Sequence, residues 1–414
     1  MKDKKKIREI VITSIISIVL LVAVVAFMLV NDGENGGSGN GSNKESNISE
    51  GNNSSTGNGQ EHYYDELFDK EVMDIKITMS EDDTFLMWET PSEDNNYYSD
   101  VIINGLSWTN VAIRVRGKKN TEAVYESGSN KYSYKLDFNE FDNKNEFYEL
   151  DGMYLHNMLE DSSYIGHYIS YKLMEELGAT VPYYALAKVQ INDGPEEWYL
   201  VTEEYNNSFA KRVTGDDGTV CLFEAANEDA VLSAEDSVAN YDVKYGDDGT
   251  KSYVDKLIEV LNNPDVTEAD IEKVLNVESA LKAMAVNYVV GNYAGYQGPD
   301  PDNYYLLYDN GIISYIEEDF AGAGGNYRKD EGYSIKVTKE NPLYDTAGEE
   351  RPLVTVLLGK EKYYKMYEGY IHELKEYIKT SDVISQAKQL LGEYTSSEQY
   401  KSGEAKLFNY LYRD

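Results

Sequence analysis

The amino-acid sequence predicts an α+β fold, placed behind one membrane-spanning helix and a flexible linker. Three observations indicate this arrangement. Residues 10–30 are apolar and uncharged, the first half of the remaining chain alternates apolar and polar residues, and much of the second half repeats apolar residues at helical spacing. Sheet and helix that segregate along the chain are typical of the α+β class.

The apolar run at residues 10–30 is long enough for a transmembrane helix. Its only polar residues are Thr13, Ser14 and Ser17, and a rise of about 1.5 Å per residue carries it across a hydrocarbon core of about 30 Å. Residues 1–9 hold five cations, a flank that tends to stay cytoplasmic. We therefore expect a single-pass membrane protein with an extracytoplasmic C-terminal domain. A cleaved signal peptide is the alternative, although its apolar region is usually shorter and no A-x-A site follows.

Residues 31–60 are rich in Gly, Ser and Asn and contain almost nothing apolar to bury, so we expect a disordered linker. Residues 61–414 are enough for one large or two-lobed domain. The formal net charge is −36, from 74 acidic and 38 basic residues, which argues against a nucleic-acid partner. The single cysteine, Cys221, lies in an apolar run and is interpreted as a buried strand residue.

The first part of the exposed domain is predicted to be sheet-rich. The segments with strand patterns are 74–79, 111–116, 132–138, 185–191 and 197–202. The last two flank a turn at 192–195 and are predicted to form a hairpin. An amphipathic helix is expected at 162–177, closed by Gly178.

The second part is predicted to be mainly helical. Helices are expected at 252–261, at 271–290 and over most of 351–391, with a strand hairpin formed by 304–308 and 312–316. The acidic, turn-rich segment 213–250 is predicted to be an excursion from the core. A sheet lobe is thus expected to meet a helical lobe through a strand pair.

Common catalytic motifs are missing from the sequence. The four histidines, His62, His156, His167 and His372, have no HExxH or zinc-ligand spacing and are interpreted as solvated or core residues. No G-x-S-x-G elbow or Walker A loop occurs. These absences argue against the commonest hydrolase and P-loop functions.

One acidic cluster has a context that favours metal binding. Residues 317–319 end the apolar strand of the second hairpin, and the facing strand opens with Asp300, Asp302 and Asn303. A hairpin of this length brings the two groups together, and their oxygens are the ligands that Mg²⁺ or Ca²⁺ prefers. Solvated carboxylates at a strand end are the alternative.

Short motifs along residues 73–391 occur in a recognisable order. They are RVRG at 114–117, KYSYKLDF at 131–138, YLHN at 154–157, DSSYI at 161–165, GATVP at 178–182, AKVQIN at 187–192, YLVTE at 199–203, NYVVGN at 287–292, NYYLLY at 303–308 and RPL at 351–353. Their order resembles the CotH kinase-like family, named after a spore-coat protein. The resemblance implies an atypical protein-kinase-like, two-lobed domain that uses ATP and Mg²⁺ to phosphorylate serine on partner proteins.

The resemblance also implies roles for several side chains that bind the nucleotide. Lys131 or Lys135 would contact phosphate, aided by Arg116. Glu203 would either orient a lysine or line the nucleotide pocket. Positive side chains at these places suit phosphoryl transfer, because the transferred group carries negative charge.

The metal site implied by the resemblance consists of Asp319, with Asn303 as a second ligand. The family motif there is commonly Pro-Trp-Asp-x-Asp, whereas this chain has Glu-Glu-Asp-Phe-Ala at 317–321. One aspartate is therefore kept and the other becomes Ala321. Glu317 or Glu318 is the candidate replacement.

A second departure falls at the expected catalytic aspartate. The family usually has it shortly after Gly-Asn at the end of a helix, and this chain has Ala294 there. Asp300 or Asp302 is the candidate replacement. Two functions follow from the resemblance: a membrane-anchored kinase that phosphorylates Ser or Thr of surface or envelope proteins, or a degenerate pseudokinase that acts as a surface-displayed binding or structural protein.

Overall fold

A computed structural model describes residues 63–69, 72–142, 148–215, 218–298, 301–325 and 351–413. The chain divides into two compact units, residues 1–57 and 58–414, and all described residues belong to the second. The predicted membrane span at 10–30 and linker at 31–60 lie outside the described residues. Within the ranges that are described, no helix is long and apolar enough to cross a bilayer.

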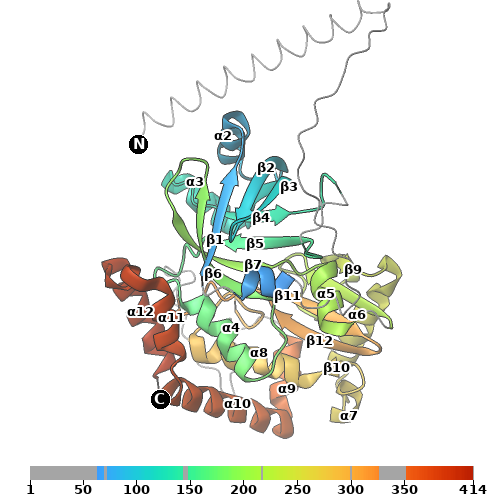
Figure 1. The fold of residues 1–414 in the computed structure, drawn as a ribbon. Helices are drawn as coiled ribbons and strands as arrows, with labels where there is room; N and C mark the ends of the chain where they lie inside the picture. Colours follow the sequence, from blue (N-terminus) through green and yellow to red (C-terminus); the bar gives the residue numbers. More distant parts are fainter. Residues whose placement is uncertain are drawn as a thin grey trace, which may run out of the picture. The chain divides into compact units, whose positions relative to one another are not determined.

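The first half of this unit is a closed β-barrel with the strand order β1-β2-β3-β4-β5-β7-β6 (Figure 1). Its strands are β1 (Val72–Thr78), β2 (Tyr97–Ile103), β3 (Leu106–Arg116), β4 (Ser133–Asp137), β5 (Gly152–His156), β6 (Tyr184–Ile191) and β7 (Glu197–Glu203). Alternate side chains point inward and form one apolar core, as the period-two pattern predicts. The predicted strands and the β6–β7 hairpin are confirmed. Shorter helices at the barrel are η1 (Tyr64–Phe68), α2 (Glu81–Glu89) and α3 (Lys118–Ser127).

A second sheet has the order β10-β12-β11-β8-β9. Its strands are β8 (Val220–Ala225), β9 (Tyr241–Tyr245), β10 (Leu275–Asn276), β11 (Tyr304–Asp309) and β12 (Ile312–Glu317). The predicted β11–β12 hairpin is confirmed, with Tyr304 opposite Glu317.

The prediction that segment 213–250 lies outside the core is wrong. Strand β8 pairs with β11, and Phe223 and Tyr241 are fully buried. The short apolar run at 220–225 is flanked by acidic turns, so the segment as a whole is polar and its strand pattern is weak. Cys221 is a buried strand residue, as expected.

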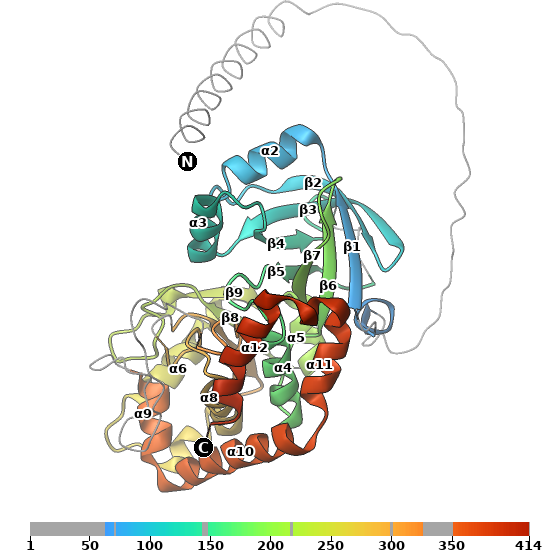
Figure 2. The same cartoon turned by 90° about the vertical axis from the view of Figure 1, so that its left-hand side faces the viewer.

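Helices cover this second sheet (Figure 2). They are α4 (Gly166–Glu176), α5 (Asn207–Thr214), α6 (Ser252–Leu261), α7 (Glu268–Ile271), α8 (Val277–Val290), α9 (Pro352–Gly359), α10 (Glu361–Thr380), α11 (Val383–Leu391) and α12 (Glu398–Leu411), with 3₁₀ turns η2 (Val238–Asn240), η3 (Asp248–Lys251) and η5 (Gly392–Ser396). Helix α8 contacts α4, β12 and α10 and is largely buried. The single helix predicted at 271–290 is divided, because β10 adds to the sheet between α7 and α8.

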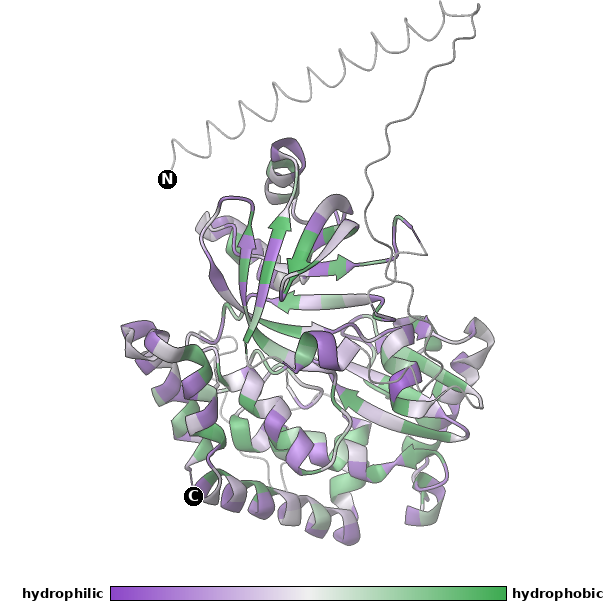
Figure 3. Cartoon of the chain, viewed as in Figure 1, coloured by the Kyte–Doolittle hydropathy of each residue, from purple (hydrophilic) through white to green (hydrophobic). Residues whose placement is uncertain are grey.

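Tyrosine supplies much of the bulk of the interior. Hydrophobic and hydrophilic residues are mixed along the barrel strands and also along α10 (Figure 3). Tyr171, Tyr205 and Tyr296 are buried, and each donates a hydrogen bond from its hydroxyl to a backbone carbonyl. A tyrosine fills a core and also satisfies a buried acceptor. The high tyrosine content therefore reflects the packing of polar backbone in the interior.

Helix α12 packs closely against the loop before α4, and this contact predicts an effect on stability. A Cβ added at Gly403 would overlap the backbone nitrogen of Ser163 and the side chain of Ser162. We expect Gly403→Ala to lower the free energy of unfolding by about 1 to 3 kcal/mol, measured by urea denaturation.

The control is Gly369→Ala on α10, where an added Cβ meets nothing within 4 Å. Alanine is the better helix former, so this change should raise stability by about 1 kcal/mol. Equal effects at the two glycines would contradict the close packing of α12.

Candidate functional site

Arg116 and Lys135, both predicted to contact phosphate, lie with Tyr154 on one face of the barrel wall, outside the barrel core. Lys135 on β4 is paired with Tyr154 on β5, and Arg116 on β3 is paired with Ser133, two residues before Lys135. Paired residues in antiparallel strands point to the same face. Arg116, Lys135 and Tyr154 therefore project together, away from the core that holds Tyr134 and Leu136.

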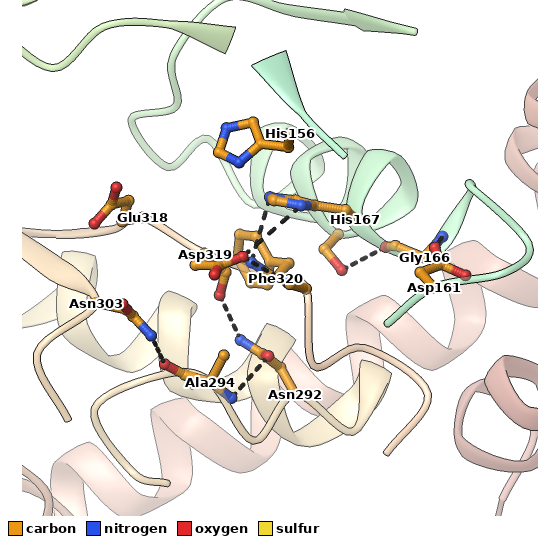
Figure 4. Close-up of polar contacts among 12 residues, drawn as sticks. His156, Asp161, Gly166, His167, Asn292, Ala294, Asn303, Glu318, Asp319 and Phe320 are labelled. Carbon is orange, nitrogen blue, oxygen red and sulfur yellow. Dashed lines mark hydrogen bonds and ion pairs between the residues drawn. The ribbon is translucent and has the colours of Figure 1, made fainter. Parts of the chain in front are cut away.

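The β11–β12 hairpin brings Asp319 and Asn303 to the same end of the second sheet. The backbone N–H of Glu318 donates to the carbonyl of Asn303 at 3.1 Å. Asn303 Nδ2 donates to the carbonyl of Ala294 at 2.7 Å, and Asp319 Oδ1 accepts from the N–H of Ala321 at 2.7 Å (Figure 4). The Asp319 side chain keeps 29% of its surface exposed. The hairpin geometry predicted from the sequence thus holds, while the metal-binding role stays a prediction.

The backbone around Asp319 is fixed by buried polar side chains. Asn292 Nδ2 donates to the Asp319 carbonyl at 2.8 Å, and the hydroxyls of Tyr171 and Tyr205 donate to the carbonyls of Glu318 and Glu317 at 2.7 and 3.2 Å. Each bond satisfies a buried carbonyl that the sheet leaves unpaired. The Asp319 carboxylate is therefore presented from an ordered backbone.

His167 is a neighbour of Asp319 that the sequence did not assign to a site. Its Nε2 accepts the Phe320 N–H at 3.3 Å, and its Nδ1 lies 3.9 Å from Asp319 Oδ1 (Figure 4). Burial lowers the pKa of His167 to about 4, so the ring is neutral near pH 7. The His156 ring lies 5.2 Å away, and burial holds its pKa well below the ordinary value. No metal-ligand spacing could have revealed this pair.

Asp161 fixes the start of α4 and so the position of His167. Its carboxylate accepts hydrogen bonds from the N–H groups of Ser163 and Gly166, at 2.9 and 2.7 Å. The Gly166 N–H belongs to the first turn of α4 and has no partner within the helix, and the Ser163 N–H lies in the loop just before it. The DSSYI motif thus places α4, which explains why the helix begins later than the pattern at 162–177 suggests.

The three predicted phosphate-binding cations have different surroundings. Arg116 pairs with Glu318 at 2.8 Å, and Lys135 pairs with Glu204 at 2.6 Å. Lys131 instead donates to the hydroxyl of Tyr164 at 2.7 Å, and burial lowers its pKa to about 8. Lys135 rather than Lys131 shares the barrel face of Arg116.

Glu203 does not contact either lysine. It is completely buried, pairs with Arg212 at 2.7 Å and accepts a hydrogen bond from Tyr63. The lysine contact falls on the next residue, Glu204, because consecutive residues leaving a strand point to opposite faces. The proposed role of Glu203 in orienting a lysine is therefore taken by Glu204, next to Lys135.

The loop that carries Ala294 is entirely buried from residue 291 to residue 298. The Ala294 N–H donates to Asn292 Oδ1 at 3.1 Å. Arg351, from the RPL motif, donates to the carbonyl of Tyr296 at 3.0 Å. Of the candidate replacements, Asp300 lies outside the described residues, and Asp302 is half-buried just before Asn303. The structure therefore shows a buried methyl group where a catalytic aspartate is expected.

Glu317 is a buried carboxyl group beneath this loop. Its Oε2 accepts hydrogen bonds from Asn287 at 2.7 Å and from Tyr315 at 3.1 Å, while Oε1 has no hydrogen-bond partner among the described side chains and backbone. Burial raises the pKa of Glu317 to about 8. The raised pKa favours the neutral, protonated form of this carboxyl group near pH 7.

The oxygen ligands at the site suit Mg²⁺ bound together with phosphate. No cluster of three His, Cys, Asp or Glu residues fit to hold a metal occurs in the part of the chain that is described. Asp319 and Asn303 contribute one carboxylate and one amide oxygen, and Mg²⁺ usually takes few protein ligands and completes its shell with water and phosphate. Two cavities lined by described residues, of about 390 and 630 Å³, lie elsewhere, beside α4 and between α6 and α7.

Comparison with known proteins identifies a family match and two similar folds. The family described as CotH kinase protein matches residues 113–406. A Shewanella oneidensis MR-1 structure of the HipA–HipB toxin–antitoxin system with its operator DNA shares 11% identity at a TM-score of 0.34, covering 63% of this chain and 58% of the other. The Helicobacter pylori proinflammatory kinase CtkA shares 11% identity at a TM-score of 0.27, covering 67% of this chain and 94% of the other. No curated protein matches the sequence.

The raised pKa of Glu317 predicts a pH effect on stability. Its ordinary pKa is 4.5, so between about pH 4.5 and 8 the folded chain holds a proton that the unfolded chain has lost. This group therefore makes stability fall as pH rises through that window. Glu317→Gln removes the titration, and we expect its stability relative to the native chain to rise by roughly 2 to 4 kcal/mol from pH 5 to pH 8.

Urea denaturation at several pH values measures the difference. The control is Glu368→Gln, an exposed glutamate on α10, for which the difference should not change with pH. A difference for Glu317→Gln that stays constant from pH 5 to pH 8 would show that Glu317 is ionised in the folded chain.

Proposed function

The chain belongs to the CotH kinase protein family, and on this premise we propose that it is a membrane-anchored kinase that transfers phosphate from ATP to serine or threonine of envelope proteins. The observation that carries the proposal is that the β11–β12 hairpin brings Asn303 and the residue before Asp319 together, with the Glu318 N–H bonded to the Asn303 carbonyl at 3.1 Å. Asp319 is the metal-binding aspartate that the family resemblance implies, and Asn303 is the second metal ligand that it implies.

The side chains around this pair suit the binding of a nucleotide with its metal. Asp319 and Asn303 would hold Mg²⁺, which neutralises phosphate charge when bound. Lys135 adds positive charge on the barrel face, and Glu204 holds it in place at 2.6 Å. Arg116 is a second cation on that face. Because phosphoryl transfer depends mainly on positioning and charge stabilisation, these groups provide most of what the reaction requires.

A second candidate function is nucleotide or cation binding without phosphate transfer. Ala294 favours it, since a buried methyl group cannot accept a proton from a substrate hydroxyl. A positioned general base contributes about 10²- to 10⁴-fold to rate. The chain would then act as a surface-displayed pseudokinase that binds a partner protein.

The anchoring part of the proposal rests on the sequence. Residues 10–30 are apolar and follow five cations in residues 1–9, which favours a cytoplasmic N-terminus and an extracytoplasmic domain. The substrates or partners of the domain would then be proteins of the cell envelope.

The nucleotide proposal predicts ligand-dependent stability. ATP with Mg²⁺ should raise the midpoint of thermal unfolding of the native chain, because a ligand at about a hundred times its Kd stabilises by about 2.7 kcal/mol. Asp319→Asn should lose at least tenfold in affinity, since the carboxylate is the charged ligand of the metal. Asp309→Asn is the matched control, an exposed aspartate at the other end of β11, and should bind like the native chain.

Labelled ATP with Mg²⁺ and envelope proteins then separates the two functions. Label that appears on serine or threonine and disappears with Asp319→Asn supports the kinase. Binding without label supports the pseudokinase, and no binding by the native chain contradicts both.

The anchoring proposal makes its own prediction. The full chain should stay in the membrane fraction after alkaline extraction, and protease added to intact cells should digest the domain. Deletion of residues 1–30 should leave the domain in the soluble fraction. A full chain that is extracted at alkaline pH would contradict the membrane span.

A further inference from the structure

An ion pair joins the barrel to the second sheet beside the candidate site. Arg116, at the end of β3, donates from Nη2 to Oε1 of Glu318 at 2.8 Å, and Glu318 directly follows β12. The two side chains retain 20% and 9% of their exposed surface. The pair is therefore largely buried, and a buried charge is stable only when it has a partner of opposite charge.

Glu318 is the partner that compensates for the buried Arg116. The guanidinium lies over the ring of Tyr154, 3.8 Å from its centre, on the barrel face that also carries Lys135. Burial alone would lower the pKa of Arg116, and the negative charge of Glu318 more than offsets this and keeps the pKa above its ordinary value. Lys135 has its own carboxylates, Glu204 and Asp137, at 2.6 and 2.9 Å.

The surroundings of Glu318 are unfavourable for a negative charge apart from Arg116. Burial disfavours the charged form of Glu318, the ion pair with Arg116 at 2.8 Å favours it, and the nearby carboxylates of Glu224 and Asp319 disfavour it. Glu224 is neutralised separately by Lys244 at 3.2 Å and accepts from the hydroxyl of Tyr305 at 3.0 Å. Among the side chains that the structure describes, Arg116 is the cation that pairs with Glu318.

The Arg116–Glu318 pair differs from the pairing expected in a site that holds a metal-bound polyphosphate. In a site that binds a metal with polyphosphate, cations face phosphate oxygens and carboxylates face the metal. Here the cation nearest to the end of β12 faces a carboxylate, and that carboxylate belongs to the residue just before Asp319. The Glu318 carboxylate thus stands where Arg116 would meet an anionic oxygen of the ligand.

We propose that Glu318 masks Arg116 as an internal substitute for phosphate, and that a polyphosphate bound with a divalent cation exchanges the partners, with Arg116 turning to the anion and Glu318 to the cation. This inference rests on the proposed nucleotide site and adds its regulation. Metal-free polyphosphate is a poor ligand, because taking Arg116 would leave Glu318 buried beside Glu224 and Asp319 without a counter-ion. The pair therefore makes the site selective for the metal-loaded ligand.

The test measures binding of inorganic tripolyphosphate and of ATP to the purified full chain in detergent, by titration calorimetry with and without Mg²⁺. Glu318→Gln removes the charge and keeps the size of the side chain. We expect it to bind metal-free tripolyphosphate at least tenfold more tightly than the native chain does, and to depend less on Mg²⁺. The double variant Arg116→Gln/Glu318→Gln should lose the gain, because the gain comes from the released guanidinium.

The matched control is Asp309→Asn, which removes an exposed carboxylate at the far end of β11. It should change metal-free binding by no more than about twofold. Glu318→Asp is a second variant in case Glu318→Gln does not fold; its shorter side chain draws the carboxylate away from Arg116 and should give a smaller gain of the same sign.

Two results overturn the masking: metal-free tripolyphosphate that binds the Glu318 variants no more tightly than the native chain, or a gain that persists in the double variant. Both hold whether or not the native chain binds ATP with Mg²⁺. A gain that depends on Arg116 in a chain that does not bind ATP with Mg²⁺ supports the masking and refutes the proposed nucleotide function.

Discussion

Burial of charge between the barrel and the second sheet is the constraint on which the rest of the structure depends. A charged side chain that leaves water must gain a partner, because the cost of an unpaired buried charge exceeds most other terms in folding. Arg116, Lys135 and Arg212 each have a carboxylate within 3 Å. Tyrosine hydroxyls satisfy the carbonyls at the end of β12 in the same way. The junction is therefore held by paired polar groups as well as by apolar contact.

This junction also explains how Asp319 is presented. Its backbone is fixed by Asn292 and by the tyrosines, and its carboxylate is the part that remains partly exposed. Neutral His167 contacts the adjacent Phe320 N–H and adds no positive charge. Among the described side chains no Lys or Arg forms an ion pair with Asp319, which is compatible with the metal-binding role proposed for it.

Much of the fold could be predicted from the sequence, because period-two patterns and helical spacing act locally. Strand β8 was missed, since a run of six residues between acidic turns gives a weak pattern and its pairing with β11 is long-range. The β11–β12 pairing that places Asn303 and Asp319 at the same end of the sheet was predictable, because a hairpin fixes its own register. The positions of His167 and Glu204 could not be predicted from the sequence. The first depends on how α4 packs against the second sheet, and the second depends on which side of the barrel wall the residue after β7 points to.

The residues proposed to bind the ligand and the residue expected to orient the substrate hydroxyl lie on different parts of this chain. The groups proposed to bind a metal-loaded anion would act through charge and are spread over β3, β4 and the β11–β12 hairpin, so the loss of one would weaken binding without removing it. The group that would orient a substrate hydroxyl is a single side chain, and at Ala294 it is a buried methyl. Binding and transfer therefore depend on separate parts of the fold. If the proposed site is correct, such a chain could hold a nucleotide even where the rate of phosphate transfer is small.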